Sequence, residues 1–289
     1  MLGSLLAATL FWVDVGPKQA LVCPPAAIDA CLAALPWDVQ QQLPRDAGRY
    51  REALALRAAM AVAVVHEDVA GMVLWAPQRL AHSESAMWNN QVYQLPLQQQ
   101  PELTLWHELG HLETKRLQGT VLPAKLTPLE QEWLADCYLL WRSARATGSL
   151  ALAWQQYHRR NLAVMSHIEN LSHWSALYLL PVLRHYTVAK LAAFTRFDDF
   201  AADFFPRVER YDADAIAEFS SLLQRVFSAA SLQPLPDYMF WRRPALGRIL
   251  QPTLVHLMGR QAANSWLQQQ HMPPLSPVVQ LTESALNKP

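Results

Sequence analysis

The sequence is short of charged residues and of glycine. Only 17% of its 289 residues are charged, Lys and Arg together balance Asp and Glu at 24 each, and 52% are hydrophobic. It has no run of basic residues and no helix-turn-helix signature, so we expect no nucleic-acid partner. Nine glycines against 20 prolines predict helices interrupted by proline rather than glycine-rich loops.

Long hydrophobic runs and abundant cysteines are also missing. The apolar run Met1 to Val13 is too short to span a bilayer as a helix, and no Lys or Arg precedes it. It fits either an unusual signal segment or a buried strand or helix, and membrane association stays open. Cys23 and Cys31 are close enough in sequence to form a disulfide, which would favour export to an oxidising compartment such as the periplasm. We expect Cys137 to be a buried thiol.

One short motif carries most of the functional information. Residues 107–111, His-Glu-Leu-Gly-His, form an HExxH motif inside a helix predicted from about residue 101 to residue 118. Residues four apart share one face of a helix, so His107 and His111 can bind a single metal ion. Glu108 then lies beside that ion, near enough to take a proton from water.

A second predicted helix supplies the third ligand that a zinc site needs. Residues 127–130, Thr-Pro-Leu-Glu, have the pattern of a capping box with proline at the first helical position, and the helix should end near Gly148. Glu132 and Asp136 are four apart on it, so both carboxylates can face one point. We expect Glu132 to bind the metal and Asp136 to orient a ligand histidine. Glu130 is the alternative ligand, but its position fits the cap better.

Together the two helices resemble those of gluzincin-type zinc metallopeptidases, which pair an HExxH helix with a second helix carrying an ExxxD-type motif. The sequence is also similar to the ImmA/IrrE-like branch, whose second helix has an acidic–Ala–Asp pattern. The resemblance covers roughly residues 90 to 145. It implies that His107, His111 and Glu132 are the zinc ligands. It also implies that Glu108 is the general base and that Asp136 is the partner of a ligand histidine. Thr114 and Leu117 exclude the metzincin branch, which has glycine and a third histidine at those places.

The chain around these helices is predicted to be mainly helical. We expect an α+β fold with a zincin-like core, in which a small sheet packs on the HExxH helix and the C-terminal part is helical. Residues 1–150 should form the metal-binding region and residues 151–289 should complete the cleft, either separately or within one continuous domain. Further helices are predicted at residues 26–35, 47–65, 150–168, 174–194, 213–229 and 245–270, with an irregular tail at 273–289. Pro181 and Pro252 should kink or break their helices.

Two apolar runs before the motif helix are predicted to be strands. They are Val69 to Trp75 and Gln91 to Leu97, with a turn at Asn89-Asn90. Pro96 places the second run at a sheet edge. An edge strand beside a zinc helix could pair with an extended peptide, and a plain structural hairpin is the equal alternative.

These features predict a zinc-dependent metallohydrolase, and specifically a peptidase with Zn²⁺ as cofactor and a peptide or protein as substrate. His173, at the start of a predicted helix, is the candidate for stabilising the oxyanion of the tetrahedral intermediate. Its rivals are four other aromatic or imidazole side chains, Tyr157, His158, His167 and Tyr178. A binding or regulatory protein that keeps the zinc site without proteolysis is the alternative, and an accidental motif in a helical protein is a third interpretation.

Overall fold

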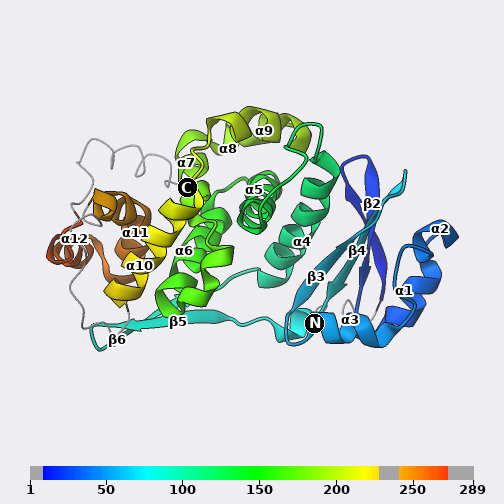
Figure 1. Cartoon of the computed structure of the whole chain (residues 1–289), viewed down its shortest axis with the longest axis horizontal. Coiled ribbons are helices and arrows are strands. Elements are labelled where there is room, and N and C mark those ends of the chain that lie inside the picture. Colours follow the sequence, from blue (N-terminus) through cyan, green and yellow to red (C-terminus); the bar gives the residue numbers. More distant parts are fainter. Residues whose placement is uncertain (1–8, 228–240, 273–289) are drawn as a thin grey trace. The chain divides into compact units, whose positions relative to one another are not determined.

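The computed structural model describes residues 9–227 and 241–272 and shows a mainly helical α+β protein, as the sequence predicts (Figure 1). The chain divides into two compact units that alternate along the sequence. The first unit holds the described residues of 1–81, 99–142 and 194–203, and the second holds those of 82–98, 143–193 and 204–289. Whether residues 1–150 and 151–289 act as separate regions stays a prediction. No helix in the described ranges is long and apolar enough to cross a membrane.

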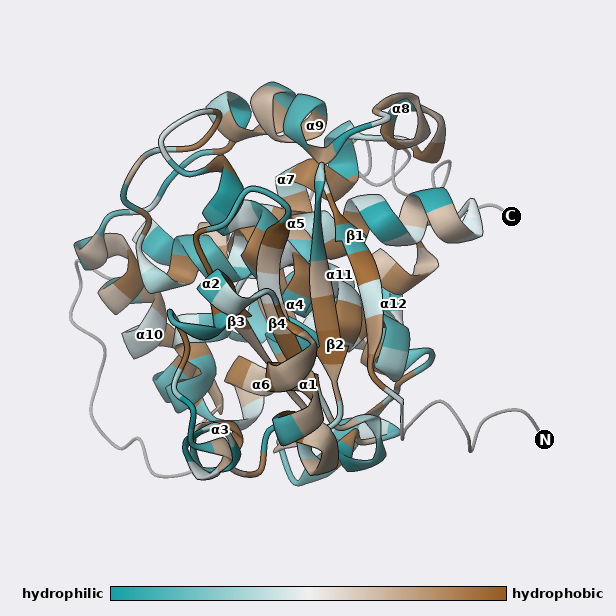
Figure 2. Ribbon diagram, turned by 90° about the vertical axis from the view of Figure 1, so that its right-hand side faces the viewer, coloured by the Kyte–Doolittle hydropathy of each residue, from teal (hydrophilic) through white to brown (hydrophobic). Residues whose placement is uncertain are grey.

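A four-stranded sheet forms the centre of the first unit. Its strand order is β1-β2-β4-β3, with β2 and β4 parallel and the two outer pairs antiparallel. The strands are β1 (Phe11–Val15), β2 (Lys18–Cys23), β3 (Ala59–Ala63) and β4 (Val69–Trp75). The central strands β2 and β4 are largely hydrophobic (Figure 2), as expected of strands that are covered on both faces. The predicted strand at residues 69–75 is therefore confirmed.

Three short helices cover one face of this sheet. They are α1 (Ile28–Ala34), α2 (Trp37–Gln40) and α3 (Ala47–Leu54), and their buried side chains form one hydrophobic core with β2 and β4. A disulfide between Cys23 and Cys31 joins β2 to α1 within this core, so the pairing that the sequence allows is present. Cys137 is a buried free thiol, as predicted.

The predicted helix over residues 47–65 was wrong in its second half. α3 ends where Ala55 takes a positive φ of 47°, and the chain continues as the edge strand β3. The many alanines of this stretch favour a helix. Met60, Val62 and Val64 nevertheless occupy every second position along it and pack against the core. Partial burial of every second residue favours a strand over a helix.

Helix α4 (Gln100–Leu117) carries the HExxH motif and packs on the sheet at β3 and β4. Gly71 permits the close packing, because a Cβ there would lie 2.2 Å from the Val62 carbonyl oxygen and 2.9 Å from Leu112 Cδ2. The helix ends just before Gly119, whose φ of +78° suits a helix stop. The predicted helix and the predicted sheet packed on it are both confirmed.

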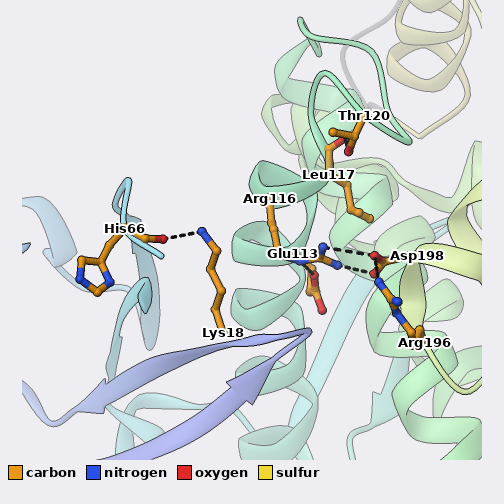
Figure 3. Close-up of polar contacts among 8 residues, drawn as sticks. All are labelled: Lys18, His66, Glu113, Arg116, Leu117, Thr120, Arg196 and Asp198. Atoms are coloured by element: carbon orange, nitrogen blue, oxygen red, sulfur yellow. Dashed lines mark hydrogen bonds and ion pairs between the residues drawn. The ribbon is translucent and has the colours of Figure 1, made fainter. Parts of the chain in front are cut away.

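A charge network joins the end of α4 to helix α9 (Phe197–Phe204). The Arg116 guanidinium donates to Glu113 Oε2 at 2.7 Å and to both oxygens of Asp198, which also accepts from Arg196 (Figure 3). The Glu113 side chain is only 2% exposed, so its charge requires this partner. On the sheet, Lys18 Nζ donates to the His66 carbonyl oxygen in the same view. The contacts of Arg116 link the C-terminal turns of α4 to α9.

The second unit combines a β-hairpin with helices. Its strands β5 (Ser83–Trp88) and β6 (Gln91–Pro96) pair through Asn89 and Asn90, which both have positive φ, and β5 packs on α6. The helices are α6 (Ala151–Ser166), α7 (Ala176–His185), α8 (Val188–Ala193), α10 (Ala213–Phe227), α11 (Arg243–Met258) and α12 (Arg260–Gln269), with the 3₁₀ turns η4 (Ile168–His173) and η5 (Phe205–Arg207). The strand predicted at residues 91–97 is therefore present, but its partner β5 was not predicted. Pairing of this strand with a peptide stays a prediction. The edge strand that packs on α4 is β3.

Two long helices predicted in the second unit are each divided. The stretch 174–194 breaks after His185, between α7 and α8, and the stretch 245–270 breaks at Gly259, whose φ is +80°. Pro181 and Pro252 lie inside α7 and α11 and do not break them. Beside Pro252, the Ile249 carbonyl oxygen accepts from two side chains of α6, those of Tyr157 and Asn161. The predicted tail at 273–289 and residues 228–229 lie outside the described residues.

Candidate metal centre

The two histidines of the HExxH motif point their rings at one place beside α4. His107 and His111 lie one helical turn apart, and their Nε2 atoms are 3.1 Å from each other. Their ring planes are nearly perpendicular, at 82°. Both side chains are partly exposed, so a ligand between the two nitrogens would be accessible from solvent.

Helix α5 (Pro128–Thr147) brings a carboxylate to the same place. Glu132 Oε2 lies 3.4 Å from His107 Nε2, and Glu132 Oε1 lies 3.5 Å from His111 Nε2. Donor atoms held about 2.05 Å from a tetrahedral ion lie about 3.3 Å apart. The two histidine nitrogens, 3.1 Å apart, come near that value, and each lies 3.4 or 3.5 Å from a different oxygen of Glu132. One ligand atom from each of the three residues lies within 4.8 Å of the others, so the group could hold one metal ion.

Asp136 contacts His107 through Nδ1, the ring nitrogen that is not part of the cluster. Its Oδ1 lies 2.8 Å from His107 Nδ1, and its side chain is fully buried. A carboxylate at this nitrogen favours the tautomer that carries its proton on Nδ1, which leaves the Nε2 lone pair for a metal. The structure therefore places Asp136 where the sequence predicts a partner for a ligand histidine.

The spacing between the two helices depends on Gly110. A Cβ at this position would lie 2.7 Å from the Ala135 carbonyl oxygen, 2.8 Å from Ala135 Cα and 3.0 Å from Tyr138 Cβ. Real Cβ atoms essentially never come within 3.0 Å of another atom, so only glycine permits this approach. Because Ala135 adjoins Asp136, the contact also sets how closely the ligands on α5 meet those on α4.

Glu130 lies at the start of α5 and forms the predicted capping box. The Thr127 N–H donates to Glu130 Oε2 at 2.7 Å, and the Glu130 N–H donates to Thr127 Oγ1 at 3.2 Å. Its carboxylate is therefore engaged at the helix N-terminus. Of the two glutamates considered as the third ligand, Glu132 is the one in the cluster.

Glu108 follows the first histidine and points at the edge strand. Its Oε2 accepts a hydrogen bond of 2.7 Å from the backbone N–H of Ala61 in β3. Burial raises the pKa of the Glu108 carboxyl above its usual range, and the charge of Glu132 adds to this. The charge of His107 and the Ala61 hydrogen bond lower the pKa and partly offset the rise.

The backbone of β3 is free to reach Glu108 because of the strand's register. The Ala58 carbonyl oxygen accepts from the Ala76 N–H just after β4, and the Val64 N–H donates to the Ala70 carbonyl oxygen in β4. The alternate residues between Ala58 and Val64 therefore turn their backbone N–H and C=O groups away from β4. These residues are Ala59, Ala61 and Ala63. Sequence reasoning missed this contact, and the alternation of alanine with larger apolar residues at 59–64 was the signal for it.

His173 lies in the second unit, in η4, and is exposed. Its Nδ1 is 3.0 Å from Ser172 Oγ. Of its rivals, His158 is buried against Thr253 of α11, and Tyr157 donates to the Ile249 carbonyl oxygen. The predicted role of His173 at the oxyanion stays a prediction.

Comparison with models of protein families, with curated proteins and with solved structures found no match for this chain. The case for a function rests on the geometry of the cluster.

Proposed function

We propose that this protein is a zinc-dependent peptidase, with His107, His111 and Glu132 as the zinc ligands. The observation that carries the proposal is the gathering of one ligand atom from each of these three residues within 4.8 Å of one another, with the two histidine nitrogens 3.1 Å apart. Two imidazoles and one carboxylate suit zinc, and three protein ligands leave the open position of a catalytic rather than a structural site. Asp136 supports the assignment, because metal-binding histidines almost always bond a carboxylate, a carbonyl or water through the other nitrogen.

Glu108 is the general base of the proposed reaction. Zinc, when bound, supplies Lewis acidity toward water and toward a substrate carbonyl. The Glu108 carboxylate takes the proton of the attacking water and passes it to the leaving nitrogen of the peptide. The Ala61 N–H holds one oxygen of this carboxylate in place, which leaves the other oxygen for the proton.

The edge of β3 supports a peptide as the substrate. An extended chain can add to an exposed strand through main-chain hydrogen bonds, and Ala59 and Ala63 turn their backbone groups to the side where Ala61 meets Glu108. A scissile bond would then lie beside the general base. The sequence suggested residues 91–97 as the edge strand that pairs with the peptide, and we propose β3 for this role instead.

One observation favours the second candidate, a zinc-binding protein without proteolytic activity. The bond between Glu108 and the Ala61 N–H ties α4 to the sheet, and this structural role needs no catalysis. A library of peptides separates the two candidates, since only the peptidase cleaves any of them.

Metal analysis is the first experiment. We expect about one zinc per chain in the wild type and a large loss in His111→Ala, with the exposed His82→Ala as a matched control that keeps its zinc. Glu108→Gln should keep zinc and lose hydrolysis, because the amide cannot accept the proton. Equal zinc in wild type and His111→Ala would refute the site, and cleavage by Glu108→Gln at the wild-type rate would refute its role.

A further inference from the structure

Two arginines lie together just before the edge strand that meets Glu108. Arg57 lies two residues before the start of β3, and Arg79 Nη1 donates to the backbone carbonyl oxygens of Ala55, at 2.7 Å, and of Arg57, at 3.1 Å. Both side chains are exposed. The pair therefore concentrates two positive charges at the N-terminal end of β3.

The local bonds of these arginines use only part of their hydrogen-bonding capacity. At the end of α3, Arg57 donates through Nε to the Leu54 carbonyl oxygen and through Nη2 to the Ala53 carbonyl oxygen, and Nη2 lies 3.3 Å from Met60 Sδ. Arg79 donates through Nη1 alone. Over the described residues, Nη1 of Arg57 and both Nε and Nη2 of Arg79 have no acceptor, and neither arginine has a carboxylate partner.

Two positive charges at the same end of β3 repel one another, and a bound anion would offset this repulsion. A guanidinium is the side chain best suited to a carboxylate, because its N–H groups match both oxygens. Arg57 also lies four residues before Ala61, whose backbone N–H binds Glu108 Oε2 at 2.7 Å. An anion bound here would therefore lie close to the general base.

We propose that Arg57 and Arg79 bind a carboxylate of the peptide substrate and so select peptides that carry one on the C-terminal side of the scissile bond. This inference rests on the proposed peptidase function. A peptide antiparallel to β3 would run from the Ala63 end toward the Ala59 end, so its C-terminal part would pass Arg57. Ala61 and Arg57 are four residues apart, roughly 13 Å of extended chain, and the arginine side chain shortens that span. The carboxylate should lie about two to four residues beyond the scissile bond.

The carboxylate has two possible sources, which are the free C-terminus of a short peptide and an Asp or Glu side chain. A hexapeptide library prepared once as free acids and once as C-terminal amides separates them, with cleavage sites read by mass spectrometry. A third set of amidated peptides carries a glutamate two to four residues after the cleaved bond. Preference for the free acids identifies the terminus, and restored cleavage of the third set identifies the side chain.

We expect the wild type to prefer the carboxylate-bearing peptides by about tenfold in kcat/KM, mainly through KM, as a charge-assisted hydrogen bond would give. The double variant Arg57→Gln with Arg79→Gln should lose this preference and still cleave the amides at the wild-type rate. Arg57→Lys with Arg79→Lys should keep part of it. Arg49→Gln, on the exposed face of α3, is the matched control and should change nothing.

Equal cleavage of acids and amides by the wild type would overturn the inference and leave the peptidase function intact. A preference that survives in the double glutamine variant would overturn it as well. If the zinc-loaded wild type cleaves no peptide, the proposed function fails, and binding of the same labelled peptides decides the inference. Tighter binding of the acids by the wild type, lost in the double variant, supports the carboxylate site, and equal binding refutes it. Thermal melts and zinc content of each variant exclude misfolding.

Discussion

Gly110→Ala should damage the metal centre although the residue binds nothing. Its Cβ would lie 2.7 Å from the Ala135 carbonyl oxygen, whereas ordinary contact begins at 3.4 Å. If the helices part along this line, they move by about 0.7 Å, the difference between the two distances. Metal sites tolerate about 0.2 Å in ligand distances. We therefore expect zinc affinity to fall at least tenfold, because Glu132 on α5 moves away from the histidines on α4.

The same substitution has two opposing effects on stability. Overpacking of a close helix contact costs about 1–3 kcal/mol, and alanine in place of glycine in a helix returns about 1 kcal/mol. The free energy of unfolding without metal should therefore fall by up to about 2 kcal/mol. Urea denaturation of the metal-free protein measures this change, and competition with a chromogenic chelator measures the zinc affinity.

Gly48→Ala is the matched control. Gly48 is also helical, but its Cβ would meet only the Asp46 carboxylate, at 3.0 Å, on a side chain that can move. We expect this variant to bind zinc as the wild type does and to be at least as stable. If Gly110→Ala also keeps wild-type zinc affinity, the close approach of α4 and α5 does not set the ligand spacing.

Two other predictions test the site and the second unit. Asp136→Asn should weaken zinc binding by about 10–100-fold, because His107 loses the carboxylate that orients it, and a chelator competition that finds no change would contradict this. Burial, with a smaller contribution from His256, lowers the pKa of His158 from 6.5 to about 3. Between those pH values the unfolded chain takes up a proton that the folded protein does not, so the free energy of unfolding should fall with decreasing pH, by up to about 1.4 kcal/mol per unit. Urea denaturation from pH 7 to pH 4 should show a shallower fall in His158→Gln, and identical slopes would refute the assignment.

The local elements around the site followed from the sequence. The capping box at Thr127, the HExxH helix and the stop at Gly119 are signals written in a few neighbouring residues, and each one acts within a turn or two of helix. The strand at residues 69–75 was equally local, since its apolar run is bounded by polar residues. The strand that ends at Pro96 was predicted together with the turn at Asn89 and Asn90, whereas its partner β5 was not.

The sequence failed where packing outweighed local preference. The alanine-rich stretch before Ala63 has the composition of a helix, but its larger side chains alternate and are partly buried against the core once the strand pairs with β4. Pro252 remains inside α11, where side chains of α6 bond the Ile249 carbonyl oxygen one turn earlier. α6 is distant in sequence from α11, so no local pattern could have predicted its contacts there. For β3 the alternation at residues 59–64 was a local signal that sequence reasoning missed.

The candidate site divides in the same way. The spacing of His107, His111 and Glu132 by itself determined which residues could bind a metal, because helical periodicity puts each side chain on a known face. Only the tertiary structure decided that the faces of α4 and α5 meet at Gly110, at a distance that no side chain would allow. It also decided that Ala61 of a distant strand bonds Glu108, since a backbone N–H carries no signature in the sequence.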